Sequence, residues 1–120
     1  MFGELFPILS TTDLPGALRF YRDLLGCVES YRFPPDGEAA YVGLRLGACD
    51  LGLTADPAAG SPTPRFALCL YADDCDRAVE HLRAAGVAVL AEPADQPWGE
   101  RMAEVADPDG NRVIILSRAA

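Results

Sequence analysis

The chain has 120 residues and a mass of 12.8 kDa, the size of one domain. There are 18 acidic residues against 10 basic ones, all of them arginine, so the formal net charge is −8. This balance argues against nucleic acid and against an anionic membrane surface as partners, because both require a basic face. The N-terminal residues lack the basic stretch of a secretory signal, and no apolar run is long enough to span a bilayer. We therefore expect a cytoplasmic protein.

The first half of the chain has the pattern of a β-α-β-β-β module. A short apolar segment ends at Asp13, whose carboxylate is placed to cap a helix over Leu14–Leu25. Apolar residues recur along that segment at helical spacing, and Gly26 ends it. The expected strands of this half are Phe6–Asp13, Val28–Phe33, Ala39–Leu46 and Asp50–Thr54.

The second half repeats the pattern at an offset of 61 residues. Asp74 corresponds to Asp13 and is placed to cap a helix over Cys75–Ala85. Asp107-Pro-Asp-Gly110 has the composition of a type I turn between the last two strands. The expected strands are Ala67–Asp74, Val87–Ala91, Arg101–Ala106 and Arg112–Ser117. The sequence thus predicts an α+β domain with module one over residues 1–57, a connector over 58–64 and module two over 65–120.

The cysteines and the histidine do not suggest a metal site or a disulfide framework. Cys27, Cys49, Cys69 and Cys75 have no C-x2-C spacing, and we expect them to be reduced and mostly buried as small apolar side chains. The one histidine, His81, falls on the flank of the second helix, where we expect it to face solvent.

Three segments give the chain a resemblance to the vicinal oxygen chelate family, which includes glyoxalases, extradiol dioxygenases, fosfomycin resistance enzymes and bleomycin resistance proteins. The first is Pro7-Ile-Leu-Ser-Thr-Thr-Asp-Leu14 followed by Arg19-Phe-Tyr-Arg-Asp-Leu-Leu-Gly26. The second is Tyr71-Ala-Asp-Asp-Cys-Asp76 with its short helix to Ala84-Ala-Gly86. The third is Gln96-Pro-Trp-Gly-Glu-Arg101 followed by Asp107-Pro-Asp-Gly-Asn111. The Gln-Pro-Trp-Gly element is most similar to the bleomycin resistance branch. The resemblance implies two tandem β-α-β-β-β modules that form a curved sheet around a cleft, and it implies a homodimer.

The resemblance also identifies the positions of the metal ligands used by the family's enzymes, on the first and last strands of each module. In this chain they fall on Phe6, Gly52, Ala67 and Ile114, none of which has a metal-binding side chain. We therefore expect no metal, no cofactor and no catalysis.

A metal-free member of this family is expected to bind and sequester a small molecule, such as a cationic, partly planar antibiotic of the bleomycin type. Such a ligand needs aromatic faces and carboxylates. The candidate ligand-binding residues are Trp98, Phe33, Tyr31, Tyr41, Asp36, Glu38 and Glu100.

Each candidate also has a structural alternative. Trp98 could close the end of a sheet, Tyr31 and Phe33 could share a core-facing side of one strand, and the acidic residues could be turn or solvent-facing residues. Two alternatives for the whole protein also remain open. One is a metal-dependent lyase or oxidoreductase whose ligands are misaligned here, and the other is a non-catalytic member with an unknown ligand.

Overall fold

The computed structural model describes residues 1–62 and 65–118 of the chain. It divides into two compact units, Met1–Gly60 and Ser61–Ala120. The expected connector, 58–64, spans this division, but its residues 63 and 64 lie outside the described residues, so its boundaries stay a prediction. No helix in the described part of the chain is long and apolar enough to cross a membrane.

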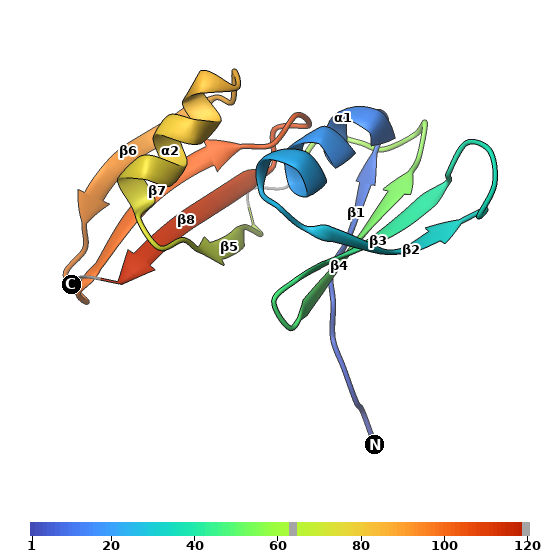
Figure 1. The fold of residues 1–120 in the computed structure, drawn as a ribbon, viewed down its shortest axis with the longest axis horizontal. Helices are drawn as coiled ribbons and strands as arrows, with labels where there is room; N and C mark the ends of the chain where they lie inside the picture. The colour runs from blue at the N-terminus through green and yellow to red at the C-terminus, as the bar shows by residue number, and fades with distance from the viewer. Residues whose placement is uncertain (63–64, 119–120) are drawn as a thin grey trace. The chain divides into compact units, whose positions relative to one another are not determined.

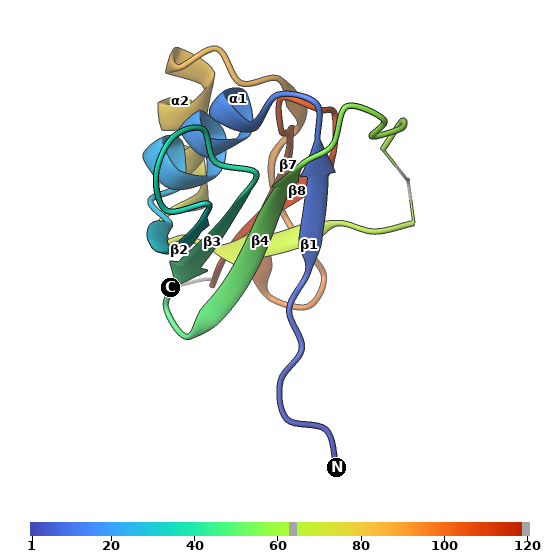
Figure 2. The same ribbon diagram turned by 90° about the vertical axis from the view of Figure 1, so that its right-hand side faces the viewer.

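The first unit has a four-stranded sheet with the strand order β1-β4-β3-β2 (Figure 1). Strand β1 runs parallel to β4, beside which it lies in Figure 2, and the other neighbours are antiparallel. The bounds are Ile8–Thr11 for β1, Val28–Phe33 for β2, Tyr41–Leu46 for β3 and Cys49–Ala55 for β4. The first strand is shorter than the expected Phe6–Asp13 segment.

The helical segment of the first unit is only partly an α-helix. Helix α1 covers Leu14–Leu18, and a π-helix, η1, continues over Arg19–Leu24. The expected continuous α-helix over 14–25 is therefore wrong in its second half. The change to the wider π bonding accompanies the burial of two consecutive rings, Phe20 and Tyr21, whose centroids lie 4.8 Å apart edge to face.

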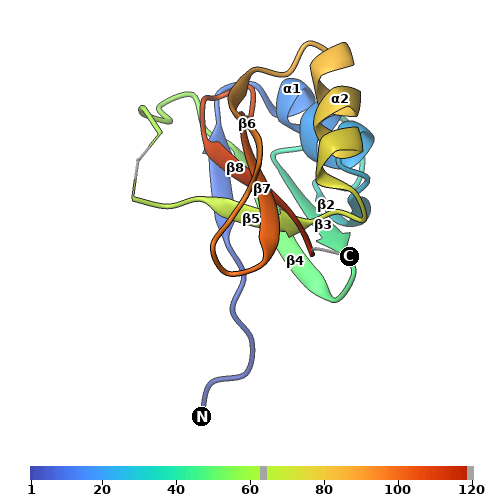
Figure 3. The same cartoon turned by 90° about the vertical axis from the view of Figure 1, so that its left-hand side faces the viewer.

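The second unit repeats the topology, with the strand order β5-β8-β7-β6 and β5 parallel to β8. Helix α2, Cys75–Ala84, covers one face of this sheet (Figure 3). The bounds are Leu68–Tyr71 for β5, Val89–Asp95 for β6, Glu100–Ala106 for β7 and Arg112–Arg118 for β8.

Strand β6 begins later than the expected Val87. The backbone N–H of Val87 donates to the Leu82 carbonyl at 3.0 Å and helps to close the end of α2, so this residue is not available to the sheet. The strand instead runs through Pro93 to Asp95, and two register shifts against β7 accommodate this path.

Each helix begins at the expected aspartate and covers the apolar face of its own sheet. Asp13 accepts a hydrogen bond from Gly16 N–H, and Asp74 accepts one from Arg77 N–H, each at 3.1 Å. The fully buried side chains of the two units are Tyr21, Phe20, Leu44, Leu53, Leu82, Val42, Val79, Val105, Val113, Thr11 and Cys75. These observations confirm the expected α+β class with two β-α-β-β-β modules.

The cysteines are free, as expected, but they are not mostly buried. Cys27 and Cys75 are buried, whereas Cys49 and Cys69 are exposed. Cys69 pairs with Ile114 and points away from α2, because it alternates along β5 with the helix-facing Leu68. His81 is exposed on α2, as expected.

Candidate functional site

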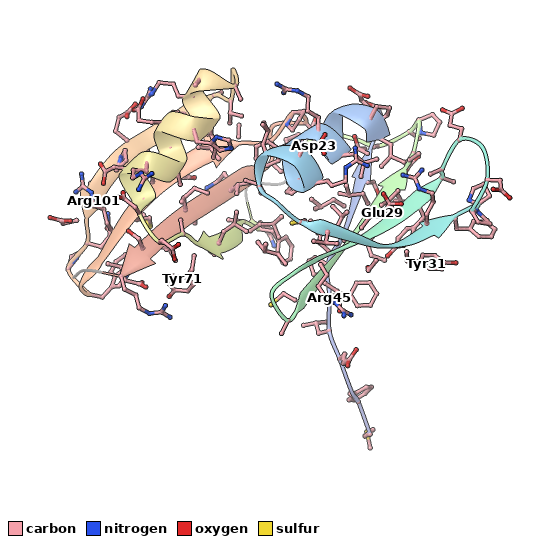
Figure 4. The ribbon with its side chains drawn as sticks, viewed as in Figure 1. Asp23, Glu29, Tyr31, Arg45, Tyr71 and Arg101 are labelled. Atoms are coloured by element: carbon pink, nitrogen blue, oxygen red, sulfur yellow. The ribbon has the colours of Figure 1, made fainter. Side chains whose placement is uncertain are left out.

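Each sheet has one face covered by its helix and one face that its helix leaves uncovered, which we call the open face. In the first unit, Val42, Leu44 and Leu53 are buried beneath the helical segment. Their neighbours along the strands point the other way because side chains alternate in a strand. The open face of this unit consists of Ile8, Ser10, Tyr31, Phe33, Tyr41, Gly43, Arg45, Asp50, Gly52 and Thr54. Figure 4 shows Tyr31 and Arg45 on the side of the sheet away from α1.

Aromatic side chains dominate this open face. Tyr31 and Phe33 are each 56% exposed, which contradicts the alternative in which they belong to the core. Tyr41 pairs with Phe33 in the adjacent strand, and its ring centroid lies 6.1 Å from that of Tyr31. The structure thus brings three of the seven candidate residues together.

The ring of Tyr41 lies across Gly52. A Cβ atom added at Gly52 would lie 2.9 Å from Cζ and 3.0 Å from Cε2 of Tyr41, closer than non-bonded carbon atoms approach. Gly52 is buried even though it is on the open face. The glycine is therefore what lets the hydroxyl end of the phenol lie against β4, and the phenol takes the space that a larger side chain would fill.

The two acidic candidates of the first unit lie apart from this aromatic surface. Asp36 is exposed in the loop between β2 and β3. Glu38, in the same loop, lines a pocket together with Arg32 and the start of α1. Arg32 pairs in register with the buried Val42, so this pocket opens on the helix side of the sheet and not on the open face.

In the second unit, Trp98 and Glu100 form part of a polar cluster. Trp98 is 61% exposed, and its Nε1–H donates to Glu100 Oε1 at 2.9 Å. The Tyr71 hydroxyl is also hydrogen-bonded to the Glu100 carboxylate, which raises the pKa of this phenol above its ordinary value. The guanidinium of Arg118 lies 4.1 Å from the centroid of the Tyr71 ring. Figure 4 shows Tyr71 on the side of β5 away from α2.

Sequence reasoning missed Tyr71 and Arg118 as members of this cluster. The alternation of β5 could have placed Tyr71 on the open face, because Leu68 and Leu70 are its apolar helix-facing neighbours. Nothing local in the sequence pairs Tyr71 with Glu100. That pairing depends on the register of β8 with both β5 and β7, in which Arg118 lies opposite Glu100.

A second charged cluster, made by Arg101, Asp76 and Asp95, ties strand β7, which also contains Glu100, to its neighbours. Arg101 points to the helix side, where it donates to both carboxylate oxygens of Asp76 at 2.6 and 3.0 Å and to Asp95 at 3.2 Å. Since Asp76 is in α2 and Asp95 ends β6, this guanidinium connects both ends of the Trp98 loop to the helix.

The strand register shows which residues lie beside two of the positions expected for metal ligands. Gly52 pairs with Ile8, and Ile114 pairs with Cys69. The expected Phe6 and Ala67 each precede these partners by two residues and lie before the strands begin. The four expected ligand positions stay a prediction.

Neither the expected positions nor their register partners fit a metal ion well. Only Cys69 has a side chain with a donor atom among Phe6, Ile8, Gly52, Ala67, Cys69 and Ile114. Within residues 1–62 and 65–118, no group of three or more histidine, cysteine, aspartate or glutamate side chains is arranged to hold an ion.

Comparison with known proteins identifies the family. Residues 5–115 match the Glyoxalase/Bleomycin resistance protein/Dioxygenase superfamily. The chain belongs to this superfamily. It is 31% identical over 119 residues to "Uncharacterized protein Mb0911c" of Mycobacterium bovis, covering 89% of this chain and 78% of that protein.

One further sequence relative and one solved structure are similar to this chain. "Putative glyoxylase CFP32" of Mycobacterium bovis is 32% identical over 109 residues, which cover 90% of this chain but only 41% of that protein. The structure of TioX from Micromonospora sp. ML1 superimposes with a TM-score of 0.79 at 20% identity, covering 98% of this chain and 99% of TioX. At that identity the likeness to TioX shows the shared fold alone.

The contact between Gly52 and Tyr41 predicts a specific coupling. Gly52→Ala should lower the free energy of unfolding by about 1 kcal/mol, because the new methyl forces the Tyr41 ring off its rotamer. In a Tyr41→Ala background the same substitution should cost nothing, since the ring is gone. Urea unfolding of the four proteins measures both costs. Equal costs in the two backgrounds would show that the ring does not depend on this glycine.

Proposed function

We propose that the chain binds and sequesters a small organic molecule that is partly planar and positively charged, without a metal ion and without changing the molecule chemically. The observation that carries this proposal is the close approach of the Tyr41 ring to Gly52, which seats the ring on the open face. Antibiotics of the bleomycin type have this combination of properties.

The aromatic surface of the first unit supports the planar part of the ligand. Tyr31, Phe33 and Tyr41 present ring faces and edges on one side of the sheet, and the first two are more than half exposed. Aromatic pairs of this kind contribute about 0.5–1.5 kcal/mol each beyond the area they bury.

The cluster in the second unit, considered by itself, favours a positively charged group. The carboxylate of Glu100 already accepts hydrogen bonds from Trp98 and Tyr71, and a carboxylate has about four acceptor positions. It can therefore accept further donors from an ammonium or guanidinium group.

A metal-dependent activity is the second candidate, because the name of the relative CFP32 refers to a glyoxylase. Enzymes of that kind polarise substrate oxygens with a metal ion. The side chains at Phe6, Gly52, Ala67 and Ile114, the positions that the family resemblance assigns to metal ligands, offer no ligand for such an ion, so we place this candidate second.

The binding proposal is tested by calorimetric titration of the whole chain with metal-free bleomycin and with proflavine, a flat cationic dye. Both should bind saturably, and binding should weaken as salt rises, because ions screen exposed charges. Tyr31→Ala and Trp98→Ala should each raise the Kd about tenfold by removing a stacking ring.

Phe66→Ala is the matched control, because Phe66 is an exposed ring outside the aromatic surface and the Glu100 cluster. It should leave both affinities unchanged. Absence of binding by both probes, or an equal loss of affinity in all three variants, would contradict the proposal.

We also propose that the chain forms a homodimer, as the family resemblance implies. Before β1, the apolar side chains of Met1, Phe2 and Leu5 are almost fully exposed, and a second copy would remove such surface from water. Sedimentation equilibrium at micromolar concentration should give twice the mass of one chain. A mass of 12.8 kDa over the whole concentration range would refute the dimer.

A further inference from the structure

A pocket of about 320 Å³ opens on the helix side of the first unit. Its apolar lining comes from the start of the helix and from two strand ends. Leu14 and Leu18 are buried residues of α1, and Ala39 and Ala55 precede β3 and end β4. A concave apolar site with a few polar groups at its edge is the usual form of a small-molecule pocket. The full lining is Thr12, Asp13, Leu14, Pro15, Leu18, Arg32, Gly37, Glu38, Ala39 and Ala55.

The carboxylate of Asp13 is held in a fixed position at this pocket. Its Oδ1 accepts the Gly16 N–H at 3.1 Å, and a Cβ added at Gly16 would overlap Oδ2. The glycine therefore allows the carboxylate to lie over the first turn of α1. One oxygen is used by the helix, and the other has no hydrogen-bond donor among the described residues.

The remaining charges leave the pocket negative. Arg32 donates to both carboxylate oxygens of Glu29, at 2.6 and 3.1 Å, so its charge is already neutralised by its own strand. Glu38 makes no hydrogen bond or ion pair with another residue in the described part of the chain. Asp13 and Glu38 thus both lack a cation.

We propose that this pocket binds a small organic cation, an alkyl- or arylammonium ion, with its apolar body on Leu14 and Leu18 and its charge between Asp13 and Glu38. The volume suits about ten non-hydrogen atoms, at the roughly 30 Å³ that a water molecule occupies in the liquid. The site uses neither the aromatic surface nor Glu100. This site is separate from the binding proposed above, so either proposal can fail while the other holds.

Benzylammonium is the probe, and benzyl alcohol is its neutral counterpart of nearly the same shape. The uniformly ¹⁵N-labelled whole chain is titrated with each, and backbone amide shifts are followed by NMR. Benzylammonium should shift the amides of Gly16, Gly37, Ala39 and Ala55 saturably. Benzyl alcohol should bind more weakly at the same amides. Equal affinity for the two probes, or shifts confined to Tyr31, Tyr41 and Trp98, would overturn the proposal.

Two substitutions remove the negative charges at the pocket while keeping the protein folded. Asp13→Asn keeps a good helix cap, and Glu38→Gln changes an exposed loop residue. Each should raise the Kd for benzylammonium about two- to fivefold, the range expected when one exposed ion pair is lost. Glu4→Gln removes the same charge from the first unit outside the pocket and should leave the Kd unchanged. An equal change in Glu4→Gln would show attraction to net charge only and would overturn the site.

Discussion

A four-stranded sheet has two faces, and each half of this chain supplies only one helical segment to cover them. The burial of Val42, Leu44 and Leu53 in the first unit, and of Val105, Val113 and Ile115 in the second, uses the helix-facing side. Alternation along the strands then sends every second side chain to the open face. The side chains on the open face are therefore the ones that the helix leaves available to a ligand.

In this chain those positions hold rings and paired charges. The pairing of Ile8 with Gly52 and of Cys69 with Ile114 leaves Cys69 as the single metal-donor side chain among these four neighbouring positions. The space above Gly52 is filled by the Tyr41 phenol. A larger residue at position 52 and the observed position of the Tyr41 ring exclude each other sterically, so the glycine and the aromatic surface are one feature of the sequence.

Local patterns predicted the repeated modules well. Asp13 and Asp74 cap the helices because capping involves residues only three apart, and the exposure of Tyr31 and Phe33 on one face follows from the strand period. The π-helix η1 was missed because it depends on how Phe20 and Tyr21 pack, which helical spacing does not encode.

The parts of the candidate site that depend on register or on loop paths were not predictable in this way. The residues that lie beside Gly52 and Ile114 could not be read from local spacing, because β1 and β5 each pair with a strand far along the chain. The sequence predicts Glu38 as a ligand-binding residue or as a solvent-facing charge at the edge of the sheet. The path of its loop instead places it on the helix side, at the pocket beside Asp13. The cluster of Tyr71, Glu100 and Arg118 likewise joins three strands.

The central claim is that the open faces are built for an organic ligand and not for a metal ion. The most direct test is the metal content of the chain after purification without chelators and after dialysis against Zn²⁺, Mn²⁺ and Ni²⁺, measured by inductively coupled plasma mass spectrometry. We predict no stoichiometric ion under any of these conditions. One divalent ion per chain that survives dialysis and is lost in Cys69→Ser would contradict it.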